Sequence, residues 1–76
     1  MTPADLFSAT GEALYGRNWK SELGEKLEVG ERQIRRWASG EYTPPPGVWA
    51  DLAVMIKDRR STLATLAKPV SEASRG

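Results

Sequence analysis

The chain has 76 residues, eleven basic and ten acidic side chains, no cysteine, no histidine and a formal net charge of +1. This length allows one small domain, near the lower limit for a self-sufficient hydrophobic core. Without cysteine or histidine there is no disulfide framework and no usual zinc ligand, so we expect no metal site and no cofactor.

No apolar run reaches the roughly 20 residues that span a bilayer. The N-terminus, MTPADLF, lacks the basic start and the apolar run of a signal peptide. We therefore expect a cytoplasmic protein that has no membrane contact.

A first helix is predicted to start within Thr2-Pro3-Ala4-Asp5 and to end at Tyr15-Gly16. The threonine can cap the helix, the proline suits its first position, and the aspartate can reach back as in a capping box. The glycine at the end can adopt the left-handed conformation. The apolar stripe of this helix consists mainly of Leu6, Phe7, Thr10, Ala13 and Leu14. Gly11 weakens a helix by up to ~1 kcal/mol relative to alanine, and a close approach by a neighbouring helix would explain it.

The stretch Leu23–Gly40, LGEKLEVGERQIRRWASG, has the pattern of a helix-turn-helix. Its apolar side chains recur one helical turn apart on either side of Glu28-Val29-Gly30, which is too short for anything but a tight turn. They are Leu23 and Leu27 before the turn, and Ile34, Trp37 and Ala38 after it. Two helices joined so closely must cross at a steep angle.

Residues at the ends of these two helices suit capping positions. Asn18 is predicted to cap the first helix, and Gly30 the second. Gly40 is predicted to end the second helix. Trp19 shares the face of the two leucines, so we expect a core residue there rather than a stacking platform.

The second helix of the motif, Glu31–Ser39, leaves one face free. With its apolar residues turned inward at about 100° per residue, Arg32 and Arg36 fall almost opposite them. Gln33 and Arg35 lie on the two shoulders. Arginine suits the O6/N7 edge of guanine, and glutamine suits the N6/N7 edge of adenine. This face therefore has the residues of a base-reading surface.

The same stretch resembles the Cro and lambda-repressor family of phage and bacterial regulators, which have an XRE-type helix-turn-helix. The family pattern is filled by Leu23, Gly24, Leu27, Val29, Ile34, Trp37 and Gly40. Two positions depart from it. Glu28 stands where the family usually has glycine, so a positive φ is expected at a glutamate. Gly30 stands where the family usually has serine or threonine.

The resemblance implies an all-α, lambda-repressor-like bundle of four to five helices with a central helix-turn-helix (19–40) and a long C-terminal helix. It implies a sequence-specific regulator of transcription that inserts helix 31–39 into the major groove of double-stranded DNA. We expect this regulator to be a repressor. A homodimer would bind a palindromic operator with half-sites about 34 Å apart. No small-molecule substrate is expected.

Specific roles follow for the exposed side chains. Those expected to read bases are Glu31, Arg32, Gln33 and Arg36. Those expected to contact phosphate are Arg17, Lys20, Arg35, Tyr42 and Thr43, with Arg35 also suited to a base.

The charge pattern leaves another class of function open. The net charge is low for a nucleic-acid-binding domain, and Glu22, Glu25 and Glu28 lie on the first helix of the motif and its turn. An alternative is therefore a protein-interaction module, an antirepressor or accessory subunit that keeps the fold without binding DNA. The chain has no histidine base, cysteine nucleophile, GxGxxG fingerprint or Walker sequence, so no enzymatic activity is expected.

After the motif, Pro44-Pro45-Pro46 predicts a rigid connector that ends in the first residue of the next helix, although a polyproline ligand is an alternative. The next helix is expected to close the core against the motif. Its apolar residues are Val48, Trp49, Leu52, Ala53, Met55 and Ile56. It is predicted to run to about Lys68, with a break near Asp58–Ser61 left open.

Pro69 is expected to end this helix, which gives a domain over residues 1–68 and a disordered tail over 69–76. Leu63 and Leu66 have few obvious partners within the domain. We expect them to form the contact of a homodimer, and the alternative is that this segment folds back over the first helix.

Overall fold

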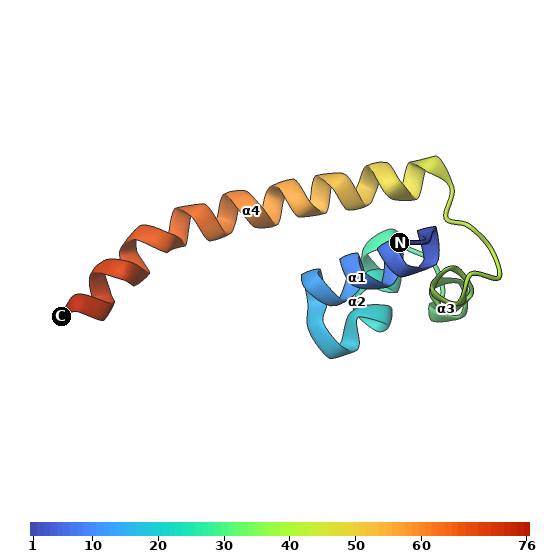
Figure 1. Ribbon diagram of the computed structural model, residues 1–76, viewed down its shortest axis with the longest axis horizontal. Helices are drawn as coiled ribbons and strands as arrows, with labels where there is room; N and C mark the ends of the chain where they lie inside the picture. Colours follow the sequence, from blue (N-terminus) through green and yellow to red (C-terminus); the bar gives the residue numbers. More distant parts are fainter.

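The computed structural model describes all residues, 1–76, and is entirely helical (Figure 1). In chain order the elements are α1 (Pro3–Tyr15), the 3-10 turn η1 (Gly16–Asn18), α2 (Trp19–Leu27), α3 (Glu31–Ser39) and α4 (Pro46–Arg75). The predicted all-α class is confirmed. None of these helices combines the length and the apolar character needed to cross a membrane.

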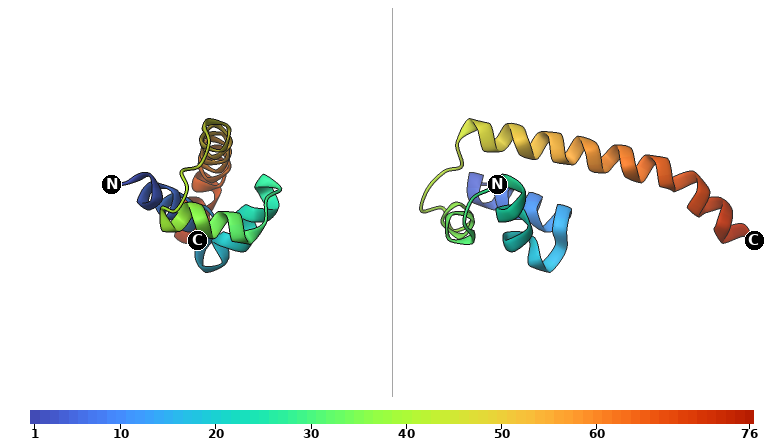
Figure 2. Two further views of the ribbon diagram at one scale, coloured as in Figure 1. Left: turned by 90° about the vertical axis from the view of Figure 1, so that its right-hand side faces the viewer. Right: turned by 180° about the vertical axis from the view of Figure 1, so that it is seen from behind.

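Helices α1, α2 and α3 pack against one another, and we call this unit the head. Helix α4 lies along α1 and then extends well beyond the head, as the views in Figures 1 and 2 show. The bundle proper is therefore smaller than the four to five helices expected, because the distal half of α4 packs against nothing.

Helix α1 begins with the predicted capping box. The Thr2 hydroxyl accepts a hydrogen bond from the backbone N–H of Asp5 (3.1 Å), and the Asp5 carboxylate accepts one from the backbone N–H of Thr2 (3.2 Å). These interactions with Thr2 lower the pKa of Asp5. The hydrogen bond with the Thr2 backbone has the larger effect, and the hydrogen bond with the Thr2 side chain has the smaller one. The helix ends at Gly16, whose φ of 72° is positive but whose ψ of −144° lies outside the left-handed helical region.

The core contains seven buried side chains from all four α-helices. They are Phe7, Leu14, Trp19, Leu23, Ile34, Trp37 and Leu52. Phe7 lies at the centre, and the rings of Trp19, Trp37 and Trp49 meet it edge to face at centroid distances of 5.7, 5.7 and 6.2 Å. Such a pair adds about 0.5–1.5 kcal/mol beyond its buried area. Because the three tryptophans belong to α2, α3 and α4, Phe7 links every helix of the protein.

Only part of the apolar stripe predicted for α1 is buried. Phe7 and Leu14 reach the core, whereas Leu6 is 45% exposed and Ala13 is also exposed. The close approach predicted at Gly11 is confirmed, and the neighbour is the Trp19 indole. A Cβ on Gly11 would lie within 2.7 Å of three atoms of that ring, so the position accepts no side chain without a shift.

The turn between α2 and α3 has the positive φ expected at a glutamate. Glu28 adopts φ 57° and ψ 41°. The Val29 N–H donates to the Gly24 carbonyl (2.9 Å), and the Glu28 N–H donates to the Glu25 carbonyl (3.2 Å). This is a Schellman motif, which satisfies the last carbonyls of α2. A non-glycine residue in this conformation costs roughly 1–2 kcal/mol.

Asn18 occupies the N-cap position of α2, as predicted, but its side chain makes no capping hydrogen bond. Its φ of −90° and ψ of 22° are those of a turn, because η1 runs directly into α2, and a capping side chain needs an extended backbone. Gly30 and Gly40 do occupy the N-cap and C-cap of α3, and Gly40 is left-handed at φ 86°.

Helix α4 starts at Pro46, as predicted, and is continuous through residues 58–61. Its main partner is α1, whereas we expected it to pack chiefly against the helix-turn-helix. The Tyr15 hydroxyl lies 4.0 Å from the Met55 sulfur, and Nη1 of Arg59 donates to the Leu14 carbonyl at 2.8 Å. The apolar spacing predicted a buried face but carried no information on which helix would cover it.

The apolar residues expected to close the core do so unequally. Leu52 is buried, and Val48, Trp49 and Met55 pack half-buried against the core. Ala53 and Ile56 are exposed, because α4 meets the head along a narrow face.

The prediction that Pro69 ends the last helix is also wrong. Helix α4 continues past the proline to Arg75, so most of the expected disordered tail is helical. Proline removes one backbone donor and crowds the carbonyl four residues earlier, which bends a helix without necessarily ending it. The distal part of α4 curves accordingly in Figure 1.

Candidate nucleic-acid interface

Helix α3 turns one face into the core and the opposite face to solvent. Ile34 is fully buried and Trp37 is 5% exposed. Arg32 and Arg35 are exposed, and Gln33 is half-buried. The face of α3 that is turned toward the core is therefore the one that the apolar spacing predicts. The first turn of α3 follows directly on the tight turn at Glu28.

The Arg36 side chain is less exposed to solvent than its position on the helix predicts. It is half-buried, and its guanidinium lies 5.7 Å from the ring centroid of Tyr42. The Tyr42 N–H donates to the Arg36 carbonyl at 3.3 Å, which brings the loop after α3 back along the end of the helix. An exposed cation–π contact contributes about 0.5–1 kcal/mol, so Arg36 is held beside the tyrosine while Arg32 projects into solvent.

Arg35 forms an ion pair with Glu31, one turn earlier on α3. The distance from Nη2 to Oε2 is 2.8 Å, and the side chains are 66% and 43% exposed. A surface pair of this spacing contributes about 0.3–0.5 kcal/mol, because water competes for both groups. A phosphate or an acceptor on a base edge can therefore replace Glu31 as the partner of Arg35 at little cost.

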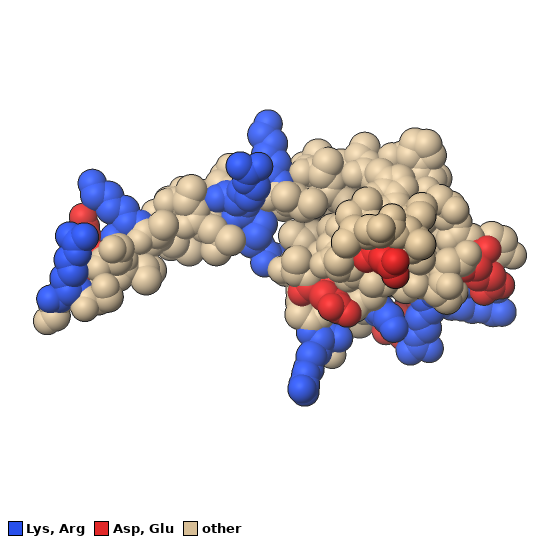
Figure 3. Space-filling model, viewed as in Figure 1, with Lys and Arg blue, Asp and Glu red and all other residues tan.

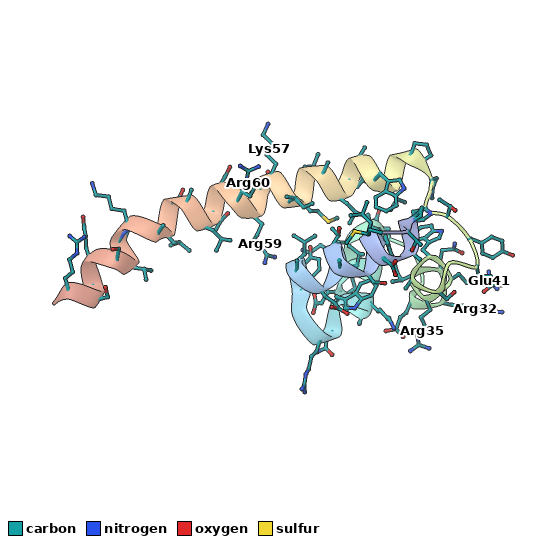
Figure 4. All side chains as sticks on the ribbon, viewed as in Figure 1. Arg32, Arg35, Glu41, Lys57, Arg59 and Arg60 are labelled. Carbon is teal, nitrogen blue, oxygen red and sulfur yellow. The ribbon has the colours of Figure 1, made fainter.

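A shallow hollow opens on this side of α3. It is lined by Arg32, Arg35, Arg36, Ser39 and Glu41. In Figure 4 Arg32 and Arg35 lie at the lower side of α3 and Glu41 lies beside it, and Figure 3 shows basic side chains on the underside of the head with acidic ones nearby. The hollow thus presents three guanidinium groups with one carboxylate at its edge, an arrangement that suits an anion or a guanine edge more than a cation.

The residues predicted to contact phosphate do not form one cluster. Lys20 and Arg35 line the same surface depression between α1, α2 and α3. Arg17 is exposed in η1 and lines a separate hollow with Glu12. Tyr42 and Thr43 are exposed in the loop after α3, with Tyr42 beside Arg36. The structure therefore brings Lys20 to the basic face of α3 and leaves Arg17 apart from it.

Ser39 and a group of basic residues on α4 were not predicted as site residues. The Ser39 hydroxyl donates to the Arg36 carbonyl (3.1 Å) and accepts from the Glu41 N–H (3.4 Å), so it fixes the end of α3 beside the hollow. A second basic cluster, Lys57, Arg59 and Arg60, lies midway along α4 (Figure 4). The run Lys57-Asp58-Arg59-Arg60 was the feature of the sequence that could have indicated this cluster. Lys57 points away from the head, and Arg59 points toward it.

No group of carboxylates in the chain is arranged to hold a metal ion, and no buried side-chain oxygen or nitrogen lacks a hydrogen-bond partner. The polar chemistry of the molecule is therefore on its surface, and the richest part of it is the arginine-bearing face of α3.

Fold and surface together define a small all-helical protein with one basic helix exposed beside a tight turn. Comparison with protein-family models, with curated proteins and with solved structures finds no match to this chain.

Proposed function

We propose that the protein is a sequence-specific DNA-binding regulator of transcription, acting as a repressor, which inserts α3 into the major groove. One observation carries the proposal: α3 buries Ile34 and Trp37 and thereby presents Arg32 and Arg35 on an exposed face next to a steep turn. The major groove admits an α-helix, and arginine makes its most specific base contact with guanine. The resemblance to Cro and lambda repressor supports the same function.

Within this proposal the side chains have different tasks. Arg32, which has no partner on the protein surface, reads guanine, and Gln33 reads adenine from a half-buried position. Glu31 accepts from cytosine once Arg35 has moved to a phosphate or a base. Arg36 reaches a base only by leaving the Tyr42 ring.

Phosphate contacts position the helix in the groove. Lys20 and Arg35 lie on one side of α3 within a shared depression, and Tyr42 and Thr43 lie at its C-terminal end. Contacts on both sides of a recognition helix fix its register along the duplex. Arg17 belongs to this set only if the duplex also reaches η1. We further propose a homodimer on a palindromic operator, with contacts through the exposed Leu63 and Leu66.

The test is selection of bound duplexes from a random pool, followed by affinity measurements over a range of salt concentrations. The affinity should fall steeply with salt because lysine and arginine release counterions from the phosphates. Arg32→Ala should weaken binding to the selected duplex by about 1–3 kcal/mol and relax the preference at one base pair. Lys20→Ala should weaken all duplexes about equally.

Arg75→Ala is the matched control, because it removes an exposed arginine at the far end of α4. It should leave the affinity nearly unchanged. Absence of association with any duplex at low salt would overturn the proposal and favour the protein-interaction module instead.

A further inference from the structure

An apolar repeat of seven residues runs along the whole of α4. Its first positions are Trp49, Ile56, Leu63 and Val70, and its fourth positions are Leu52, Arg59, Leu66 and Ala73. A strict seven-residue repeat is the pattern by which two helices pack side by side in a coiled coil. We call this line of residues the seam, and Arg59 is its one charged member.

The two halves of the seam have different surroundings. In the first half, Leu52 is 2% exposed and Trp49 packs on the head. Arg59 marks the boundary, because it binds the Leu14 carbonyl near the end of α1 and its guanidinium lies 5.6 Å from the Tyr15 ring. In the second half, the three large apolar side chains are 51–64% exposed; they are Leu63, Leu66 and Val70. The seam that α1 covers therefore continues without a partner.

We propose that a second copy of α4 covers the exposed half of the seam, in antiparallel orientation. This inference deepens the proposed homodimer and rests on it, but it does not depend on DNA binding.

The arrangement of the head excludes a parallel pair. A parallel partner would have to follow the same seam toward Pro46, where Trp49 and Leu52 already pack on the head. It would also set Arg59, the charged member of the seam, opposite the same residue of the second copy, and like charges repel. In an antiparallel pair the two heads lie at opposite ends and neither obstacle arises (Figure 1).

The sequence of the seam selects a register for the antiparallel pair. When Leu63 of each copy faces Leu66 of the other, Ile56 faces Ala73 and Arg59 faces Val70. No arginine then faces a second arginine, and every large apolar residue of the exposed seam gains an apolar or aliphatic neighbour. Val70 falls beside the aliphatic part of Arg59, which is held in place by α1.

The same register fills a groove on the surface of the head. An open hollow of about 340 Å³ lies where α4 leaves α1, and it is lined mainly by apolar and small side chains. Its lining includes Ala9, Ala13, Leu14 and Ile56, with Arg59 and Arg60 at its edge. The last two turns of the second copy, which carry Val70 and Ala73, would lie at the mouth of this hollow. The groove and the seam thus form one continuous apolar surface.

The pairing has a consequence for the spacing of DNA half-sites. The starts of the two α4 helices, near which the two α3 helices lie, would be about 55 Å apart at 1.5 Å per residue. Half-sites one turn apart lie about 34 Å apart. A dimer of this kind would therefore not occupy half-sites one turn apart on an unbent duplex, and the selected operators should have a longer spacing.

The first experiment measures the mass of the full chain by sedimentation equilibrium over a wide concentration range, without DNA. The chain should form a dimer, and Leu63→Glu/Leu66→Glu should abolish it. The matched control, Ser61→Glu/Thr65→Glu, adds the same charge to exposed positions on the other side of α4 and should still dimerise. Tryptophan fluorescence should show an intact core in both variants, because none of these residues touches the head.

The second experiment determines orientation. The chain has no cysteine, so Arg75→Cys gives a single site for a nitroxide label. The distance between labels should be about 30 Å in the antiparallel pair, from the rise per residue, and about 10 Å in a parallel one. A monomer at every concentration, a dimer that survives the seam variant, or labels about 10 Å apart would overturn the inference. A dimer that binds no duplex would overturn the proposed function and leave the inference standing.

Discussion

Gly11 provides a direct test of how closely α1 and α2 approach. In an ordinary helix interior, Gly→Ala stabilises a protein by about 0.5–1 kcal/mol, because glycine has more conformational freedom to lose. Here the new methyl group would lie within 2.7 Å of three atoms of the Trp19 indole. We therefore expect Gly11→Ala to have the opposite sign and to destabilise the fold.

The size of the effect follows from the freedom of the indole. Trp19 is 4% exposed, and its ring packs edge to face on Phe7, which two further tryptophans also contact. The ring cannot move aside without disturbing this cluster. Overpacking of a core costs about 1–3 kcal/mol. After subtraction of the gain in helix propensity, Gly11→Ala should reduce the free energy of unfolding by about 1–2 kcal/mol, which lowers Tm by roughly 5–15 °C in a domain of this size.

Urea and thermal unfolding, followed by circular dichroism and tryptophan fluorescence, measure this change. Gly47→Ala is the matched control, because it lies in the first turn of α4 and a Cβ there meets no atom within 4 Å. It should be neutral or stabilising by up to ~1 kcal/mol. If Gly11→Ala proved as stable as this control, the packing of the indole on α1 would be refuted.

A double-mutant cycle assigns the effect to the indole itself. Trp19→Leu should destabilise the protein because it removes a buried ring. In that background Gly11→Ala should cost little or become favourable, since the smaller leucine leaves space for the methyl group. Additive effects of the two substitutions would contradict the proposed clash.

Three further predictions concern stability. Glu28→Gly should raise the free energy of unfolding by about 1 kcal/mol in urea titrations, because the left-handed conformation suits glycine; an unchanged or lower midpoint would contradict this. Because folding lowers the pKa of Asp5, its contribution is present above about pH 4 and is lost as the pH falls through the folded-state pKa. A thermal unfolding series against pH should show this loss, and Thr2→Val should reduce it. Leu52→Ala should cost about 2–5 kcal/mol, because Leu52 is the one buried side chain of α4; a loss below 1 kcal/mol would show that the α1–α4 contact is weak in solution.

The parts of the fold that depend on neighbours in the sequence were predictable. The spacing of Ile34 and Trp37 was enough to orient α3, because a helix places residues three and four apart on one face. Thr2 and Asp5 form their hydrogen bonds within one turn. The positive φ of Glu28 was expected because this glutamate stands where the resembled family usually has glycine. In each case the cause lies within a few residues of the effect.

The parts that depend on distant packing were not predictable from one sequence. Arg36 is half-buried because the loop after α3 returns to it and carries Tyr42, which helical rotation does not describe. The Asn18 side chain makes no capping hydrogen bond because η1 continues into α2. The partner of the first half of α4 is α1, whereas its apolar face would have fitted the motif equally well. Pro69 stays within a helix although its local preference is to end one.

The two proposed activities, DNA binding and dimerisation, depend on different parts of this short chain, and Phe7 and Arg59 mark these parts. Phe7 connects α3 to the core through Trp37, so the direction of the arginine-bearing face is set inside the head. Arg59 is the last residue of the seam that the head holds, through the Leu14 carbonyl. Beyond it no side chain of α4 is buried. Substitutions at Leu63 and Leu66 therefore cannot change the position of α3 through the core. If they change the affinity for a DNA half-site, the cause must be the loss of the second copy.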